Sequence, residues 1–215
     1  MSPQKKISIA IAKECLAALP NVDFKGEIEV IDTPEKVRQA IDILSRESLV
    51  GFDTETRPNF HKGQNHQVAL IQISTATKSY LFRICTTGLM PEIIALIENE
   101  SITKVGLSLK DDFHMLHKLQ LFDPKSFIEL QQMVKDYNIT DASLQKIFGI
   151  IFGQRISKGQ RLSNWEAPQL APAQQLYAAI DAWACLKIYN YLKSGKFNPL
   201  NSPYITAPEE TSETA

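Results

Sequence analysis

The sequence predicts one α/β domain built around a mixed β-sheet. The chain has 215 residues, of which 44% are hydrophobic and 22% are charged, as in a soluble globular domain with a sizeable core. Candidate strands come first along the chain and helices are interleaved later, which is the order of an α/β domain. Two of the strands are separated only by a short polar turn, which adds an antiparallel hairpin to the sheet.

The expected strands are short apolar runs bounded by polar or turn-forming residues. They span residues 27–31, 49–55, 68–74, 79–84, 102–105 and 127–130. The turn around Ala76-Thr77-Lys78 joins the third and fourth strands as the hairpin. A polar loop at residues 56–66 separates the second strand from this hairpin.

The expected helices show apolar residues at helical spacing. A weak helix near residues 9–19 is stopped by Pro20, and a second begins at Asp32-Thr33-Pro34-Glu35, where a capping residue precedes proline. Further helices are expected at residues 91–98, 109–119, 142–148 and 173–192.

Three features set the domain organisation and the expected location of the protein. Residues 1–26 are expected to be an N-terminal extension, and residues 196–215, rich in Pro, Ser, Thr and Glu, a disordered tail. No apolar run reaches the length of a membrane span, so no membrane partner is expected. The 3 cysteines are scattered and form no paired motif, which predicts reduced thiols and a cytoplasmic protein.

The strand at residues 49–55 ends in two carboxylates, Asp53 and Glu55. Side chains alternate along a strand, so these two project from the same face. Two like charges at the end of an apolar strand are costly to fold unless a cation lies between them. We therefore expect a divalent metal at this position.

The helix at residues 109–119 carries a second acidic position. At 100° per residue, Asp112 falls on the apolar arc of this helix, whereas its neighbour Asp111 falls on the polar arc. An acid on the buried side needs a partner, which favours Asp112 as the functional one. The alternative is that Asp112 is an ordinary acid in the first turn, which stabilises the helix by its favourable interaction with the helix dipole.

The long helix at residues 173–192 carries a third position. Tyr177 and Asp181 are one turn apart, so their side chains are neighbours, and several alanines allow the helix to pack closely. Taken alone, this pattern favours an ordinary Tyr-Asp pair on a helix edge. Together, Asp53, Glu55, Asp112 and Asp181 place four acids at one core, which predicts a site for two cations, Mg²⁺ or Mn²⁺.

Three segments in order carry a family resemblance. They are Phe52-Asp53-Thr54-Glu55, residues 104–116 with Asp112, and Tyr177-Ala178-Ala179-Ile180-Asp181-Ala182, preceded by Ser163-Asn164-Trp165. They resemble the motifs of the tyrosine-bearing (DEDDy) 3′–5′ exonucleases, such as ribonuclease D and the Werner-syndrome-helicase exonuclease domain. The resemblance covers residues 27–195 and marks them as an exonuclease domain. One departure is Glu129, where relatives often have aspartate; we interpret this position as structural.

The resemblance implies a ribonuclease-H-like fold with a mixed five-stranded sheet and helices on both sides. It also implies roles for five residues. Asp53, Glu55 and Asp181 would hold one cation, Asp53 and Asp112 the second, with Asp112 acting through water. Tyr177 would orient the attacking water, and a 5′-nucleoside monophosphate would leave from a 3′ end.

The substrate implied is single-stranded or 3′-ended DNA or RNA. Because the formal net charge is only −1, any basic contact surface must be local. Four cations lie near the motifs and are candidates for phosphate contact: Arg57, Lys62, Lys158 and Arg161. Two alternatives remain, a catalytically silent nucleic-acid-binding module on the same fold and an enzyme restricted to short oligonucleotides; the five filled motif positions argue against the first.

Overall fold

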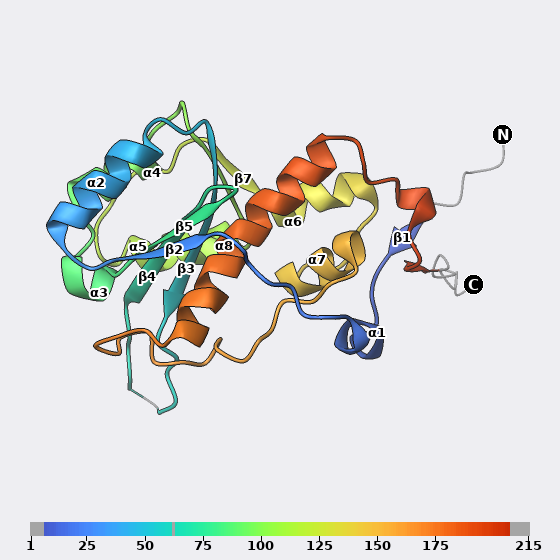
Figure 1. The fold of residues 1–215 in the computed structure, drawn as a ribbon, viewed down its shortest axis with the longest axis horizontal. Coiled ribbons are helices and arrows are strands. Elements are labelled where there is room, and N and C mark those ends of the chain that lie inside the picture. Colours follow the sequence, from blue (N-terminus) through green and yellow to red (C-terminus); the bar gives the residue numbers. More distant parts are fainter. Residues whose placement is uncertain (1–6, 62, 207–215) are drawn as a thin grey trace, which may run out of the picture.

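A six-stranded mixed sheet forms the centre of the molecule. The computed structural model describes residues 7–61 and 63–206, and Figure 1 shows its ribbon. The strands follow the spatial order β2-β5-β4-β3-β6-β7. Their bounds are β2 Glu27–Ile31, β3 Leu49–Thr56, β4 Val68–Ser74, β5 Lys78–Phe82, β6 Thr103–Gly106 and β7 Phe127–Glu129. The β3–β4 and β4–β5 pairs are antiparallel, and the other three pairs are parallel.

Helices cover both faces of this sheet (Figure 1). One apolar cluster joins it to α2, α4 and α5, and another joins it to α7 and α8. The helix bounds are α1 Lys13–Ala18, α2 Pro34–Leu44, α3 Ile84–Thr87, α4 Pro91–Ile97, α5 Leu109–Leu116, α6 Leu130–Met133, α7 Leu144–Phe152 and α8 Pro172–Lys193, with the 3₁₀ turn η1 at Val134–Tyr137. The predicted α/β architecture is confirmed.

The sheet has six strands, one more than the expected five. The edge strand β2 pairs with β5 along all five of its residues, and the short strand β7 pairs with β6 at the other edge. All six segments read from the sequence as strands therefore join one sheet. The expected hairpin is also present, as β4 and β5.

The first and last strands of the described residues pair with each other. In the N-terminal segment, β1 (Ser8–Ile9) pairs antiparallel with β8 (Ile205–Thr206), and Ile9 and Ile11 are fully buried in the core. The disordered tail predicted from residue 196 is therefore wrong for residues 196–206, which form η2 (Pro199–Asn201) and β8. The pairing with β1 and the packing of Tyr204 on the core order this stretch. The rest of the predicted tail lies outside the described residues.

A close approach between α8 and β3 positions the acidic residues. An added Cβ on Gly51 would lie 1.9 Å from the carbonyl oxygen of Ala182, so only glycine fits at this point of β3. On the helix side, Ala178, Ala179 and Ala182 are fully buried, as expected for a helix that packs closely. Asp53 follows Gly51 by two residues and Asp181 precedes Ala182 by one, so this packing brings the two acids together.

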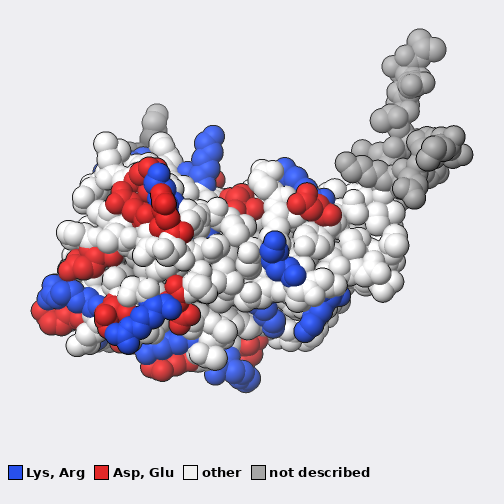
Figure 2. Space-filling view, turned by 90° about the horizontal axis from the view of Figure 1, so that it is seen from above, with Lys and Arg blue, Asp and Glu red and all other residues white. Residues whose placement is uncertain are grey.

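Surface charge is mixed rather than segregated. Figure 2 shows acidic and basic side chains interspersed on one face, with no large field of one sign on that face. This agrees with a formal net charge of −1. Within the described residues, no helix combines the length and apolar character needed to cross a membrane.

Candidate active site

Three carboxylates converge where β3 meets α8. Asp53 and Glu55 come from the end of β3, and Asp181 comes from the middle of α8. One oxygen of each lies within 4.8 Å of the others, a spacing that allows all three to contact one cation. Alternation along β3 places the first two on one face, and the helix crossing that face supplies the third.

Asp112 lies beside this group but outside its compact set of three. It is half-buried on α5 while Asp111 is exposed, as the helix phase predicts. Its carboxylate accepts a hydrogen bond from the Thr54 hydroxyl, and its negative charge raises the pKa values of Asp53 and Glu55. The structure thus brings three of the four predicted ligands together and holds the fourth next to them.

The electrostatics of the cluster favour a bound cation. Burial, followed by repulsion from the other acids, raises the pKa of Asp53 well above its ordinary value and that of Glu55 to about 9. Burial also raises the pKa values of Asp112 and Asp181 to about 7, against the opposing effect of one hydrogen bond each. Carboxylate oxygens are the donors that Mg²⁺ and Mn²⁺ prefer, so these residues fit a divalent metal.

Tyr177 stands one turn before Asp181, and its hydroxyl is near enough to the Asp181 carboxylate to lower the pKa of Asp181. Burial and the nearby acids raise its pKa far above the ordinary value, so the hydroxyl keeps its proton. Its ring lies 6.0 Å from that of the fully buried Trp165. Tyr177 is therefore held as a neutral hydrogen-bonding group at the edge of the acidic cluster.

Glu129 on β7 holds the helix that carries Asp112. Its carboxylate accepts backbone N–H bonds from Ser108 at 3.1 Å and Leu109 at 2.8 Å, at the start of α5. A third bond, from the N–H of Gln131, fixes the carboxylate itself at 2.9 Å. Glu129 therefore has a positioning role that sequence reasoning did not identify, because its partners lie about twenty residues away in the chain.

The four cations proposed for phosphate contact have different surroundings. Lys158 and Arg161 line a cavity of about 400 Å³ that also includes Tyr177 and Asp181, and the charge of Arg161 lowers the pKa of Glu55. Arg57 instead pairs with Glu166 at 3.2 Å. Lys62 lies outside the described residues.

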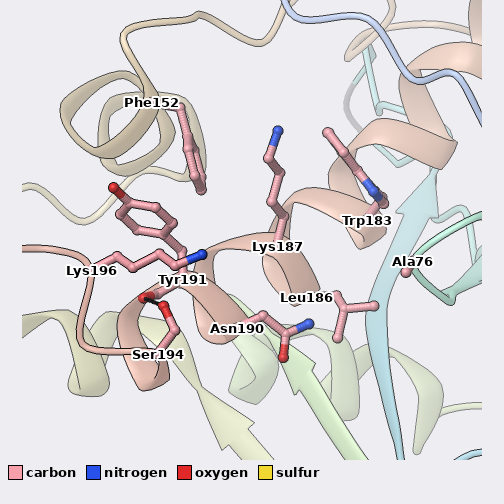
Figure 3. Close-up of a pocket in the computed structure, with 9 residues that line it drawn as sticks. All are labelled: Ala76, Phe152, Trp183, Leu186, Lys187, Asn190, Tyr191, Ser194 and Lys196. Carbon is pink, nitrogen blue, oxygen red and sulfur yellow. Dashed lines mark hydrogen bonds between the residues drawn. The ribbon is translucent and has the colours of Figure 1, made fainter.

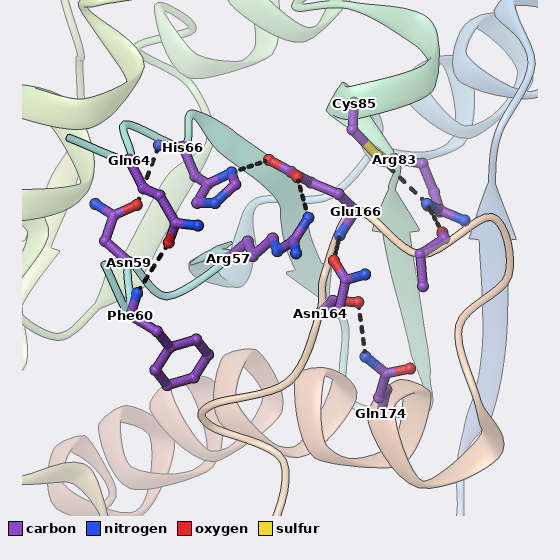
Figure 4. Close-up of polar contacts among 11 residues, drawn as sticks. Arg57, Asn59, Phe60, Gln64, His66, Arg83, Cys85, Asn164, Glu166 and Gln174 are labelled. Atoms are coloured by element: carbon purple, nitrogen blue, oxygen red, sulfur yellow. Dashed lines mark hydrogen bonds and ion pairs between the residues drawn. The ribbon is translucent and has the colours of Figure 1, made fainter. Parts of the chain in front are cut away.

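Glu166 links two loops beside the site, a feature that the sequence did not reveal. It pairs with Arg57 and also with His66 Nδ1 at 2.9 Å, so the β3–β4 loop is tied to the segment before α8 (Figure 4). Asn164 and Gln174 extend these contacts to the start of α8 through a hydrogen bond of 3.2 Å. The guanidinium of Arg57 therefore serves to hold this loop against the segment before α8.

Comparison with known proteins agrees with this geometry. Residues 28–195 match the model of a 3′–5′ exonuclease family. The mouse bifunctional 3′–5′ exonuclease/ATP-dependent helicase WRN is 34% identical over 187 residues, covering 81% of this chain and 13% of that protein. Ribonuclease D from Haemophilus influenzae is 29% identical over 191 residues, covering 86% of this chain and 44% of that protein. The chain thus spans less than half the length of these two relatives.

Solved structures share the fold. The EXO domain of Aedes aegypti Nibbler has a TM-score of 0.71 at 22% identity, covering 81% of this chain and 92% of that one. Escherichia coli RNase D has a TM-score of 0.71 at 20% identity, covering 78% of this chain and 44% of that one. With a family match over most of its length and a shared fold, the chain belongs to the DEDDy-type 3′–5′ exonucleases, a family of nucleic-acid hydrolases.

Proposed function

We propose that this domain removes nucleotides from the 3′ ends of nucleic acids by a two-metal-ion mechanism. The observation that carries the proposal is the convergence of Asp53, Glu55 and Asp181 within 4.8 Å of one another, beside Asp112 and Tyr177. Ionised together, these acids repel one another, so cation binding is what makes the arrangement favourable.

The five residues divide into metal ligands and one residue that positions the attacking water. Asp53, Glu55 and Asp181 would hold one Mg²⁺ or Mn²⁺ ion, and Asp53 with Asp112 would hold the second. Bound as a pair, two such ions stabilise the attacking and leaving oxygens of a phosphodiester. The Tyr177 hydroxyl, which remains protonated beside Asp181, orients the attacking water through a hydrogen bond rather than acting as a free base.

Substrate contact is proposed for the cavity next to Tyr177. Lys158 and Arg161 supply positive charge there and would contact a backbone phosphate of the substrate. The solved structure of Trypanosoma brucei RNase D, at 19% identity and a TM-score of 0.69, is a complex with RNA U12, so one relative with this fold binds RNA. We propose single-stranded or 3′-ended DNA or RNA as the substrate class and 5′-nucleoside monophosphates as products.

A gel time course tests the proposal. Single strands of DNA and RNA, labelled at either the 3′ or the 5′ end, are incubated with the protein in Mg²⁺, Mn²⁺ or chelator. The 3′ label should be released first as a mononucleotide, and the 5′-labelled strand should shorten stepwise, only with metal present. Internal cuts as the first products, or full activity in chelator, would show that the two-metal exonuclease assignment is wrong.

A further inference from the structure

A second cavity, separate from the acidic cluster, lies between α7, α8 and the β4–β5 turn. Its volume is about 330 Å³. Figure 3 shows Lys187 standing between the rings of Phe152 and Trp183, with Tyr191 and Lys196 nearby. The remaining lining residues are Ala76, Leu186, Asn190 and Ser194.

This cavity lies on the opposite side of α8 from the catalytic acids. Trp183, Lys187 and Asn190 follow Asp181 by 2, 6 and 9 positions. At 100° per residue, these positions point about 180–240° around the helix from Asp181. A strand bound at the acidic cluster therefore does not pass through this cavity, and a ligand here is a separate binding event.

The lining combines aromatic rings with two lysines that pair with no carboxylate of the described residues. The Nζ of Lys187 lies 4.5 Å from the centre of the Trp183 ring and 4.8 Å from that of Phe152. No Asp or Glu lines the cavity, and within the described residues neither Lys187 nor Lys196 forms an ion pair with a carboxylate. The Lys187 ammonium is half-buried and Lys196 is exposed. Two ammonium groups lining one cavity that contains no acid are suited to bind an anion.

We propose that this cavity binds a free nucleoside monophosphate. The phosphate contacts the ammonium groups of Lys187 and Lys196, and the base packs against the aromatic wall formed by Phe152, Trp183 and Tyr191. Phosphate recognition by lysine and stacking of a base on aromatic rings are both common in nucleotide sites. Asn190 and Ser194, whose side chains also line the cavity, offer hydrogen-bonding groups for the base or ribose.

The size of the cavity favours one nucleotide over a stretch of strand. Its volume of about 330 Å³ is at the lower end of the range of small-molecule sites, about 300–1,000 Å³. The β4–β5 turn at Ala76 bounds it on one side, and the segment after α8, with Lys196, bounds it on another. Binding here needs no divalent cation and no turnover, so its failure is distinguishable from a failure of the proposed exonuclease activity.

Calorimetric titration of AMP and UMP into the protein tests this site directly. The titrations are run in chelator, which removes metal-dependent binding at the acidic cluster. Lys187→Gln and Lys196→Gln are compared with Lys193→Gln, which removes an exposed lysine of the same helix that does not line the cavity. We expect about tenfold or greater weakening of AMP binding in the first two variants, since each loses a charge-assisted phosphate contact, and wild-type binding in the third.

Three ligand controls complete the test. Adenosine and inorganic phosphate should each bind much more weakly than AMP, because adenosine lacks the phosphate and inorganic phosphate lacks the base. An oligothymidylate that binds more tightly than UMP in a Lys187-dependent manner would show a strand site and overturn the assignment to a free nucleotide. Wild-type affinity in both lysine variants, or no detectable AMP binding at millimolar concentration, would also overturn it. Lys196 is exposed, so its variant stays informative even if Lys187→Gln does not fold.

Discussion

Asp181→Asn should stabilise the metal-free protein while abolishing its activity. Asp181 is only 8% exposed and lies within 4.8 Å of Asp53 and Glu55. Asparagine keeps the shape of the side chain and an oxygen that can accept the Tyr177 hydroxyl, but it carries no charge. The substitution therefore removes the cost of burying a charged carboxylate, at the expense of a proposed metal ligand.

The magnitude follows from the raised pKa of Asp181. Its pKa rises from the ordinary 3.8 to about 7, mainly through burial. Each pKa unit corresponds to about 1.4 kcal/mol, so ionising Asp181 at pH 8 destabilises the fold by up to about 4 kcal/mol. For a chain of this size about 1 kcal/mol changes the melting temperature by about 2–4 °C, so we expect a gain of up to about 8–16 °C in Asp181→Asn at pH 8.

The pH dependence has a definite sign. Between about pH 4 and pH 7 the folded state keeps a proton on Asp181 that the unfolded chain releases, so the free energy of unfolding falls as pH rises through this window and levels off above it. The advantage of the variant should therefore be less than half of its full value at pH 5 and full at pH 8.

Thermal unfolding in chelator at pH 5 and pH 8 measures both effects, and a repeat with Mg²⁺ measures the metal contribution. Wild type should gain much more from Mg²⁺ at pH 8 than Asp181→Asn does, because a bound cation offsets the cost of burying the ionised carboxylate, which the variant lacks. Asp111→Asn, at an exposed acid on α5, serves as the matched control and should change neither quantity. An Asp181→Asn protein that melts at or below the wild-type temperature in chelator at pH 8 would refute the reasoning.

Three other substitutions test the remaining parts of the site. Tyr177→Phe should slow single-turnover hydrolysis by about 10–100-fold with little change in melting temperature, since it loses one hydrogen bond to the attacking water; a wild-type rate would make Tyr177 a packing residue. Asp112→Asn should abolish activity and Asp111→Asn should not, and the reverse pattern would contradict the assignment of the second motif. Glu129→Gln should lower the free energy of unfolding by about 1–2 kcal/mol and reduce turnover more than substrate binding, because weaker bonds to the start of α5 let Asp112 shift. Unchanged turnover would confine Glu129 to a structural role.

Local patterns in the sequence account for the parts of the site that could be predicted. The projection of Asp53 and Glu55 from one face follows from strand alternation, and the choice of Asp112 over Asp111 follows from helix phase. Both depend only on the neighbours of each residue along the chain. The convergence of these elements with α8 is not local, and the sequence indicated it only through the presence of four acids at core-facing positions and through the family resemblance.

Contacts between distant segments account for what the sequence did not reveal. The Arg57–Glu166 pair joins residues 109 positions apart, so nothing near Arg57 indicated that a carboxylate would occupy it. The same reason applies to Glu129, which caps α5 from a neighbouring strand. For residues 196–206, composition predicted disorder. Pairing of β8 with β1 orders the end of this stretch instead, and the sequence did not indicate this pairing because β1 lies near the other end of the chain.

The site divides into a rigid part and an adaptable part. Asp53, Glu55 and Asp181 stand on β3 and α8, whose spacing is fixed by the contact between Gly51 and the backbone of Ala182. Lys158 and Arg161 instead lie on the exposed segment between α7 and α8. Groups on packed elements hold metal geometry more accurately than groups on loops, whereas loops tolerate sequence change. The preference of this domain among nucleic acids should therefore depend on the α7–α8 segment, and its hydrolytic chemistry on the packing of one glycine against one helix.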